Sequence, residues 1–244
     1  MNNRFHLFSL LCIVFTMLLS LHSCRNTRGG KAVVVGNDQY FALVKPYLKG
    51  GYDVTMVPKG ISMLPTIGDN TDLVTLHADT MVKPNDIVLV QMKSGQYVMH
   101  RIIKVEGNNI TLKGDNNRSV EHAAKDNVLA RVMAHQKGGA VSTNTAKADR
   151  NASYRLTPHL RLDKCPEGKV VVDTLKHVVY MQRVVAMNEA AQMLWDKFQG
   201  REFHISDMAK ALTEIYDIDM DRAESDCTQL INSWLQCALV QKVE

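Results

Sequence analysis

Between residues 31 and 134, apolar residues occur in short β-branched runs that are separated by turn residues. Such runs, bounded by Gly, Asn and Asp, are typical of the strands of an all-β domain. One exception lies near the start, between Tyr40 and Leu48, where apolar residues recur at helical spacing and predict one amphipathic helix. The expected strands contain the sequences AVVV, YDVTMV, DLVTL, DIVLVQM, YVMHRIIKV and ITL.

After residue 153 the apolar period changes from two to about 3.6, and this change predicts a second domain. Its first part contains three expected strands, LRLDKC, KVVVDT and HVVYMQ, and three amphipathic helices follow. We expect Asn188 to cap the first helix, Ser206 the second, and either Asp219 or Asp221 the third. Such side chains accept hydrogen bonds from the free N–H groups of the first helical turn.

These patterns predict an α+β protein. A mostly-β domain covers residues 31–135, and a small domain of three strands plus three helices covers residues 154–244. Residues 136–153 are small and polar without an apolar period, so we interpret them as a linker.

Residues 1–30 have the pattern of a targeting segment. The run Leu7–Leu21 has no charged residue and follows a short basic start, as in a secretory signal. The run contains 15 residues, whereas a membrane-spanning helix needs about 20. Cys24 follows in the sequence LHSC, which resembles a lipoprotein cleavage box and predicts that Cys24 is lipidated.

Two other interpretations of this segment stay open. Arg25, Arg28 and Lys31 follow the apolar run, and this excess of positive charge favours an uncleaved inner-membrane anchor with the protein body inside. A misassigned start codon is the third interpretation. We expect membrane association, either as an anchor or as a lipoprotein, without assigning the side of the membrane.

Charge and cysteine spacing exclude several classes of partner. The chain has 29 Lys and Arg against 25 Asp and Glu, a formal charge of +4, without a block of basic residues, so we expect no nucleic acid partner. The five cysteines form no C-x-x-C pair, so their spacing fits neither a zinc site nor a disulfide framework, and we expect no metal and no cofactor. His77, His122 and His135 show no partner pattern and are interpreted as solvated.

Three short sequences contain residues suited to nucleophilic catalysis. Ser62 lies in KGISMLPTIGDN before a strand, His100 lies within the strand YVMHRIIKV, and Asp115 lies in the turn sequence TLKGDNN. A serine hydroxyl is a weak nucleophile, which needs a base within hydrogen-bond reach and donors for the developing oxyanion.

In this order, the three sequences resemble the signal-peptidase and LexA-like serine endopeptidase superfamily between about Val54 and Met133. A histidine base, in place of lysine, resembles the archaeal and endoplasmic-reticulum branch. The resemblance implies that Ser62 is the acylating nucleophile and that His100 is the general base and then the general acid.

The resemblance leaves the third catalytic residue open. Either Asp115 or Glu121 would orient the imidazole. The family's oxyanion hole uses the N–H of Ser62 and a donor two residues earlier, where Gly60 offers no hydroxyl.

Residues Leu156 to Val240 resemble the PqqD family, a winged-helix domain that recognises ribosomally made, modified peptides. The sequences that carry this resemblance are VVYMQRVVAMNEAAQMLWDKFQG, FHISDMAKALTEIYDID and AESDCTQLINSWLQCALV. It implies that a leader peptide adds as a strand beside the third strand, against a groove next to the third helix. The implied peptide-binding residues are His177, Val178, Val179, Tyr180, Met181 and Gln182.

Together, the two resemblances predict a serine endopeptidase that binds a ribosomally made precursor peptide through its PqqD-like domain and cleaves it. The alternative is a catalytically inactive peptide-binding chaperone for peptide modification or export. The expected partners are the precursor or leader peptide, a peptide-modifying enzyme or transporter, and the membrane through the N-terminal segment.

Overall fold

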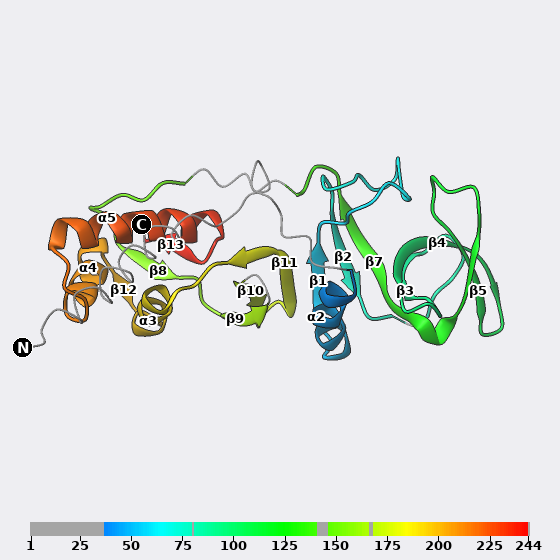
Figure 1. Ribbon diagram of the computed structural model, residues 1–244, viewed down its shortest axis with the longest axis horizontal. Helices are drawn as coiled ribbons and strands as arrows, with labels where there is room; N and C mark the ends of the chain where they lie inside the picture. Colours follow the sequence, from blue (N-terminus) through cyan, green and yellow to red (C-terminus); the bar gives the residue numbers. More distant parts are fainter. Residues whose placement is uncertain (1–36, 80, 141–145, 166–167, 244) are drawn as a thin grey trace, which may run out of the picture.

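The computed structural model describes residues 37–79, 81–140, 146–165 and 168–243. The proposed targeting segment, including Cys24, and the expected strand AVVV lie outside these residues. Figure 1 shows a mostly-β part, coloured blue to green, and a part with three helices, coloured yellow to red. The structure confirms the α+β class and the order of a mostly-β domain followed by a small domain.

The described residues of the mostly-β domain form one helix, seven strands and one turn of 3₁₀ helix. The expected helix and the expected strands within the described residues are confirmed, whereas the sequence analysis did not list β6 and β7. The elements are α2 (Asn37–Lys49), β1 (Asp53–Met56), β2 (Leu73–His77), β3 (Ile87–Gln91), β4 (Tyr97–Glu106), β5 (Asn109–Lys113), β6 (Glu121–Ala124), η1 (Lys125–Asn127) and β7 (Val128–Gln136).

The second domain contains the three expected strands and the three expected helices. Three further short strands form a second sheet in the order β12-β8-β13, which the sequence analysis did not predict. The elements are β8 (Tyr154–Leu156), β9 (Leu160–Cys165), β10 (Gly168–Asp173), β11 (Val178–Val185), α3 (Glu189–Lys197), β12 (Glu202–Phe203), α4 (Ile205–Thr213), α5 (Met220–Gln236) and β13 (Val240–Lys242).

The helix caps follow the sequence in two cases out of three. The Asn188 side chain caps α3, and Asp219 rather than Asp221 caps α5, each accepting a backbone N–H at 2.8 Å. The expected cap Ser206 is wrong, because α4 begins at Ile205, two residues earlier than a cap at Ser206 would place it, and His204 is its N-cap.

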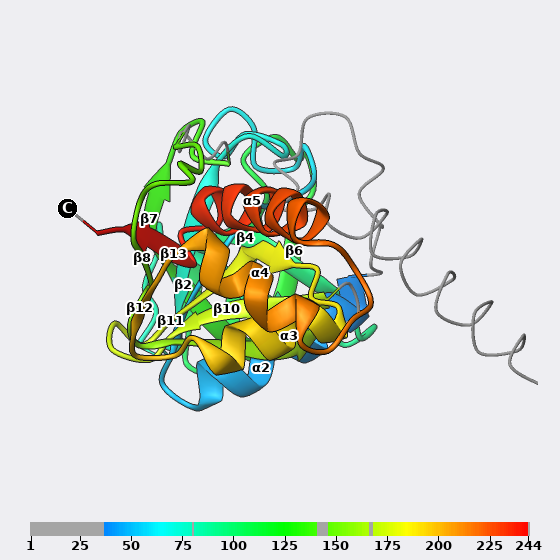
Figure 2. The same ribbon diagram turned by 90° about the vertical axis from the view of Figure 1, so that its left-hand side faces the viewer.

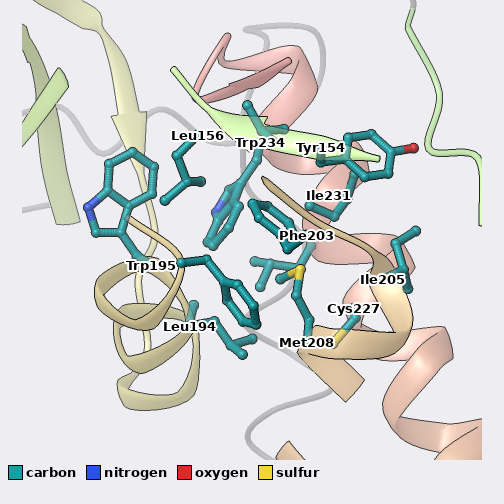
Figure 3. Close-up of a cluster of buried hydrophobic side chains, with 14 of the residues drawn as sticks. Tyr154, Leu156, Leu194, Trp195, Phe203, Ile205, Met208, Cys227, Ile231 and Trp234 are labelled. Atoms are coloured by element: carbon teal, nitrogen blue, oxygen red, sulfur yellow. The ribbon is translucent and has the colours of Figure 1, made fainter. Parts of the chain in front are cut away.

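Aromatic side chains fill the core of the second domain. Trp195 of α3 and Trp234 of α5 meet edge to face, with ring centroids 5.6 Å apart. Figure 3 shows Trp234 near Phe203 and Leu156, so that side chains from helices and from the small sheet meet in one cluster. Figure 2 shows α3, α4 and α5 on the side nearest the viewer, in front of the strands of the large sheet.

Within the part of the chain that the structure describes, one sheet of ten strands runs through both domains in the order β6-β5-β4-β3-β7-β2-β1-β11-β10-β9. The crossing point is a parallel pair, in which Asp53–Thr55 of β1 lie opposite Val178–Tyr180 of β11. Figure 1 shows these two strands side by side where the domains meet. The linker is therefore not the sole connection between the domains.

No helix among the described residues is long and apolar enough to cross a membrane. The same residues contain no group of three or more His, Cys, Asp or Glu side chains arranged to hold a metal ion.

Candidate active site

Ser62 lies in the loop that connects β1 to β2. The side chains of Met63 and Ile67 are buried and anchor this loop to the core, while Ser62 stays half-buried. Two backbone hydrogen bonds within the loop hold its turns, from Ile67 N–H to Met63 C=O at 2.9 Å and from Asn70 N–H to Pro58 C=O at 3.0 Å. The nucleophile candidate is thus presented by an anchored loop.

The turn after β5 contacts the same loop. The backbone C=O of Ser62 accepts the N–H of Asn116 at 2.8 Å, and the Asn116 side-chain amide donates to Ile61 C=O at 3.1 Å. A Cβ atom on Gly114 would come within 2.7 Å of the Ser62 carbonyl oxygen. This close approach explains why Gly114, which has no Cβ atom, stands before Asp115 in the turn sequence KGDNN.

His100 is the buried histidine of β4, with 5% of its surface exposed. Its Nδ1 atom lies 2.5 Å from Oε2 of Glu121, the first residue of β6. Its Nε2 atom has no hydrogen bond with any described residue. A carboxylate at Nδ1 holds the ring in the tautomer that leaves Nε2 able to accept a proton.

Asp115 has other partners. Its carboxylate accepts two hydrogen bonds from Arg101, from Nε at 2.8 Å and from Nη2 at 2.7 Å. The Thr66 hydroxyl donates to the same carboxylate at 2.5 Å. The arginine hydrogen bonds are the main reason that the pKa of Asp115 lies below its usual range. Of the two alternatives for the acid, Glu121 is therefore the one hydrogen-bonded to His100.

Asp115 nevertheless links the two halves of the site. Thr66 belongs to the Ser62 loop, and Arg101 directly follows His100 on β4. The carboxylate therefore ties the loop of Ser62 to the strand of His100. The Ser62 hydroxyl has no hydrogen bond within the described residues, so the serine and the histidine are not hydrogen-bonded to each other. Such bonds are often long in unliganded sites and shorten when substrate binds.

Gly60 occupies the position of the family's second oxyanion donor, and its backbone N–H is already hydrogen-bonded. The backbone N–H of Gly60 donates to Oδ1 of Asp69 at 2.8 Å, and Gly60 has a φ of 131°, where glycine is favoured. A carboxylate on this N–H prevents it from binding an oxyanion in the same state.

Two known families match parts of this chain. Residues 23–133 match the family model described as Peptidase S24-like, and residues 169–240 match that of coenzyme PQQ synthesis protein D (PqqD). The chain joins a Peptidase S24-like domain to a PqqD-like domain. A search of curated proteins found no match. The first match contains Ser62, His100, Asp115 and Glu121, and the second contains α3, α4 and α5.

Two histidines of the peptidase-like domain have partners that the sequence analysis missed. His77 lies 2.6 Å from Asp53, and His135 lies 2.6 Å from Asp72, so neither is a simple solvated side chain. His77 and Asp53 meet because β1 and β2 are adjacent antiparallel strands. Strand pairing would have been needed to find these partners, because each pair is distant in sequence.

Asp72 supports the end of the loop that contains Ser62. It accepts the backbone N–H of Gly68 at 2.8 Å and that of Gly138 at 3.0 Å, in addition to the His135 ring. These two backbone hydrogen bonds are the largest cause of a pKa far below the usual range for Asp72. The network fixes the loop where β2 begins.

The implied peptide-binding edge of the PqqD-like domain carries a strand of the same chain. Asp53 N–H donates to His177 C=O at 2.8 Å, and the next residues continue as the β1–β11 ladder as far as Tyr180. The prediction that a leader adds beside His177–Gln182 is untested, and β1 lies along the first part of that edge.

Proposed function

We propose that this chain is a serine endopeptidase that cleaves a ribosomally made precursor peptide, which the PqqD-like domain recognises. The observation that carries the proposal is the 2.5 Å contact between His100 Nδ1 and the Glu121 carboxylate, with His100 Nε2 left unbonded among the described residues. The two family matches support a peptidase and a peptide-binding domain in one chain.

In this proposal, Ser62 attacks the scissile carbonyl while His100 Nε2 takes the hydroxyl proton. Glu121 stabilises the imidazolium that forms, and the imidazolium then gives its proton to the leaving amine. Water attacks the acyl-enzyme with His100 again as the base. The N–H of Ser62 would stabilise the oxyanion, and Gly60 N–H becomes a second donor only when Asp69 releases it.

We assign Asp115 a positioning role. Its bidentate contact with Arg101 and its contact with Thr66 tie the Ser62 loop to β4. Because arginine is permanently charged, this contact is the same in every protonation state of the site. Asp115 therefore sets the geometry of the nucleophile and the base without exchanging protons.

A fluorophosphonate probe that acylates activated serines tests the proposal. We expect the folded full chain to be labelled, and both heat denaturation and Ser62→Ala to remove the label. A folded chain that stays unlabelled would contradict the endopeptidase and favour the alternative, a peptide-binding chaperone for modification or export. The missing Ser62–His100 hydrogen bond is the observation on which that alternative depends.

The partners and the location complete the proposal. A precursor peptide is the substrate, and a modifying enzyme or transporter would act on the same peptide. Attachment to a membrane through the run Leu7–Leu21, as an anchor or with lipidated Cys24, would place the site near exported precursors. Fatty-acid labelling that is lost in Cys24→Ser would distinguish the lipoprotein from the uncleaved anchor.

A further inference from the structure

The edge of β11 is occupied by β1 through several kinds of contact. Beyond the backbone ladder, the Thr55 hydroxyl approaches Val179 C=O at 3.3 Å and Gln182 Oε1 at 2.9 Å. The Tyr52 ring stacks on the His177 ring, with centroids 5.2 Å apart. β1 thus fills this part of the edge as an added peptide strand would.

Apolar packing on one face of the same sheet also favours the contact between β1 and β11. Val170, Val172, Val179 and Met181 are buried in one cluster with apolar side chains of the peptidase-like domain. Tyr47 of α2 reaches β9, where its hydroxyl donates to Asp163 at 2.7 Å. Burial of this face favours the state in which β1 is on β11.

We propose that β1 closes the peptide-recognition edge of the PqqD-like domain from within the chain, so that a peptide strand must compete with β1 for Val178–Tyr180. This inference rests on the proposed function, in which that edge takes a precursor segment. A peptide that competes with a bound internal strand has its apparent affinity reduced by the fraction of molecules in which the edge is free.

The side chains at and next to β1 also indicate which kind of peptide segment this edge accepts. Tyr52, directly before β1, presents its ring to His177, and β1 adds two buried apolar side chains, Val54 and Met56, with the Thr55 hydroxyl between them. An extended segment with an aromatic residue followed by alternating apolar residues fits the same positions. Because β1 runs directly into the Ser62 loop, occupation of this edge is linked to the position of the nucleophile.

A labelled synthetic peptide with the sequence GYDVTMVP, which copies residues 51–58, serves as the competing strand. Its binding to the full chain is followed by fluorescence anisotropy in a pair of variants. Asp53→Pro removes the N–H that donates to His177, whereas Asp53→Ala keeps it, and both lose the contact with His77. We expect Asp53→Pro to bind the peptide at least about tenfold more tightly than Asp53→Ala.

A cross-link gives the opposite test and does not depend on weakening the fold. Asp53 and Val178 are direct partners across the ladder, so Asp53→Cys with Val178→Cys can form a disulfide that fixes β1 on β11. We expect the oxidised protein to bind the peptide at least about tenfold more weakly than the reduced protein. Val178→Cys alone, with and without reductant, controls for the native cysteines.

Equal binding by the oxidised and reduced proteins overturns the inference, as does the absence of binding in every variant. The same preparations are treated with the fluorophosphonate probe, so that the two proposals fail separately. If Ser62 is unlabelled but the cross-link blocks the peptide, the endopeptidase proposal fails and the closed edge is supported. If Ser62 is labelled and the cross-link has no effect, only the closed edge is wrong.

Discussion

Asp115 and Glu121 lie at the two ends of the turn between β5 and β6, yet their surroundings differ. Asp115 holds a permanent cation, Arg101, in a bidentate contact, whereas Glu121 holds His100, whose charge depends on a proton. A carboxylate on arginine keeps its partner through a reaction cycle, while one on histidine can stabilise a charge that appears and disappears. In the proposed mechanism, Asp115 therefore serves the structure, and Glu121 stabilises the protonated form of His100.

The largest expected effect is at Ser62 and His100, the proposed nucleophile and base. Ser62→Ala and His100→Ala should each lower the rate of peptide hydrolysis by roughly 10³-fold or more, because the two groups act as a unit. The double variant should be hardly slower than either single variant. Single-turnover assays on a precursor peptide measure this, and losses that multiply in the double variant would contradict a shared step.

The next effect separates the two carboxylates directly. Glu121→Gln should lower the hydrolysis rate by roughly 10²- to 10⁴-fold while leaving the melting temperature nearly unchanged, because it disturbs the imidazole. Asp115→Asn keeps the size of the side chain but loses the charge, so it should lower stability together with activity. Hydrolysis rates and melting temperatures, measured for both variants, distinguish the two roles. A large loss of rate in Asp115→Asn without a loss of stability would assign the catalytic role to Asp115.

A smaller effect is expected at Arg101, the hydrogen-bond partner of Asp115. Arg101→Lys cannot make the two parallel hydrogen bonds to Asp115, and we expect a loss of about 1–3 kcal/mol in the free energy of unfolding. Lys104→Ala is a matched control on the same strand, since its ion pair with Glu106 is exposed and should be worth less than about 1 kcal/mol. Equal losses in urea denaturation would show that the Asp115 contact is not structural.

The sequence predicted those features of this site that depend on local order. The serine loop, the histidine strand and the glycine turn could be located because each is a short continuous pattern. Choosing between Asp115 and Glu121 was not possible, because the choice depends on which side chain crosses from β6 to β4. Arg101 and Thr66, which bind Asp115, had no signal of their own in the sequence.

The same limit applies to the PqqD-like domain. Its helices follow from a 3.6-residue period, and Asn188 caps α3 as expected because capping is a contact within one turn. The parallel pairing of β1 with β11 joins residues more than a hundred positions apart, and a four-residue strand does not specify its neighbour. Register and pairing are set by burial of the whole sheet, which no short pattern records.

The smallest effect is the pH dependence of the Asp115 contact. Arg101 holds the pKa of Asp115 below its usual range in the folded protein, whereas an unfolded aspartate titrates near about 3.9. A lowered folded-state pKa means that the contact stabilises the protein fully above the unfolded pKa, and that this stabilisation is lost as the pH falls through the folded pKa. The difference in free energy of unfolding between the native chain and Asp115→Asn should therefore be constant from neutral pH to about pH 5 and shrink below about pH 4. Urea denaturation of both proteins across this range measures it, and a difference that stays constant into strong acid would mean that the charge of Asp115 contributes nothing to the fold.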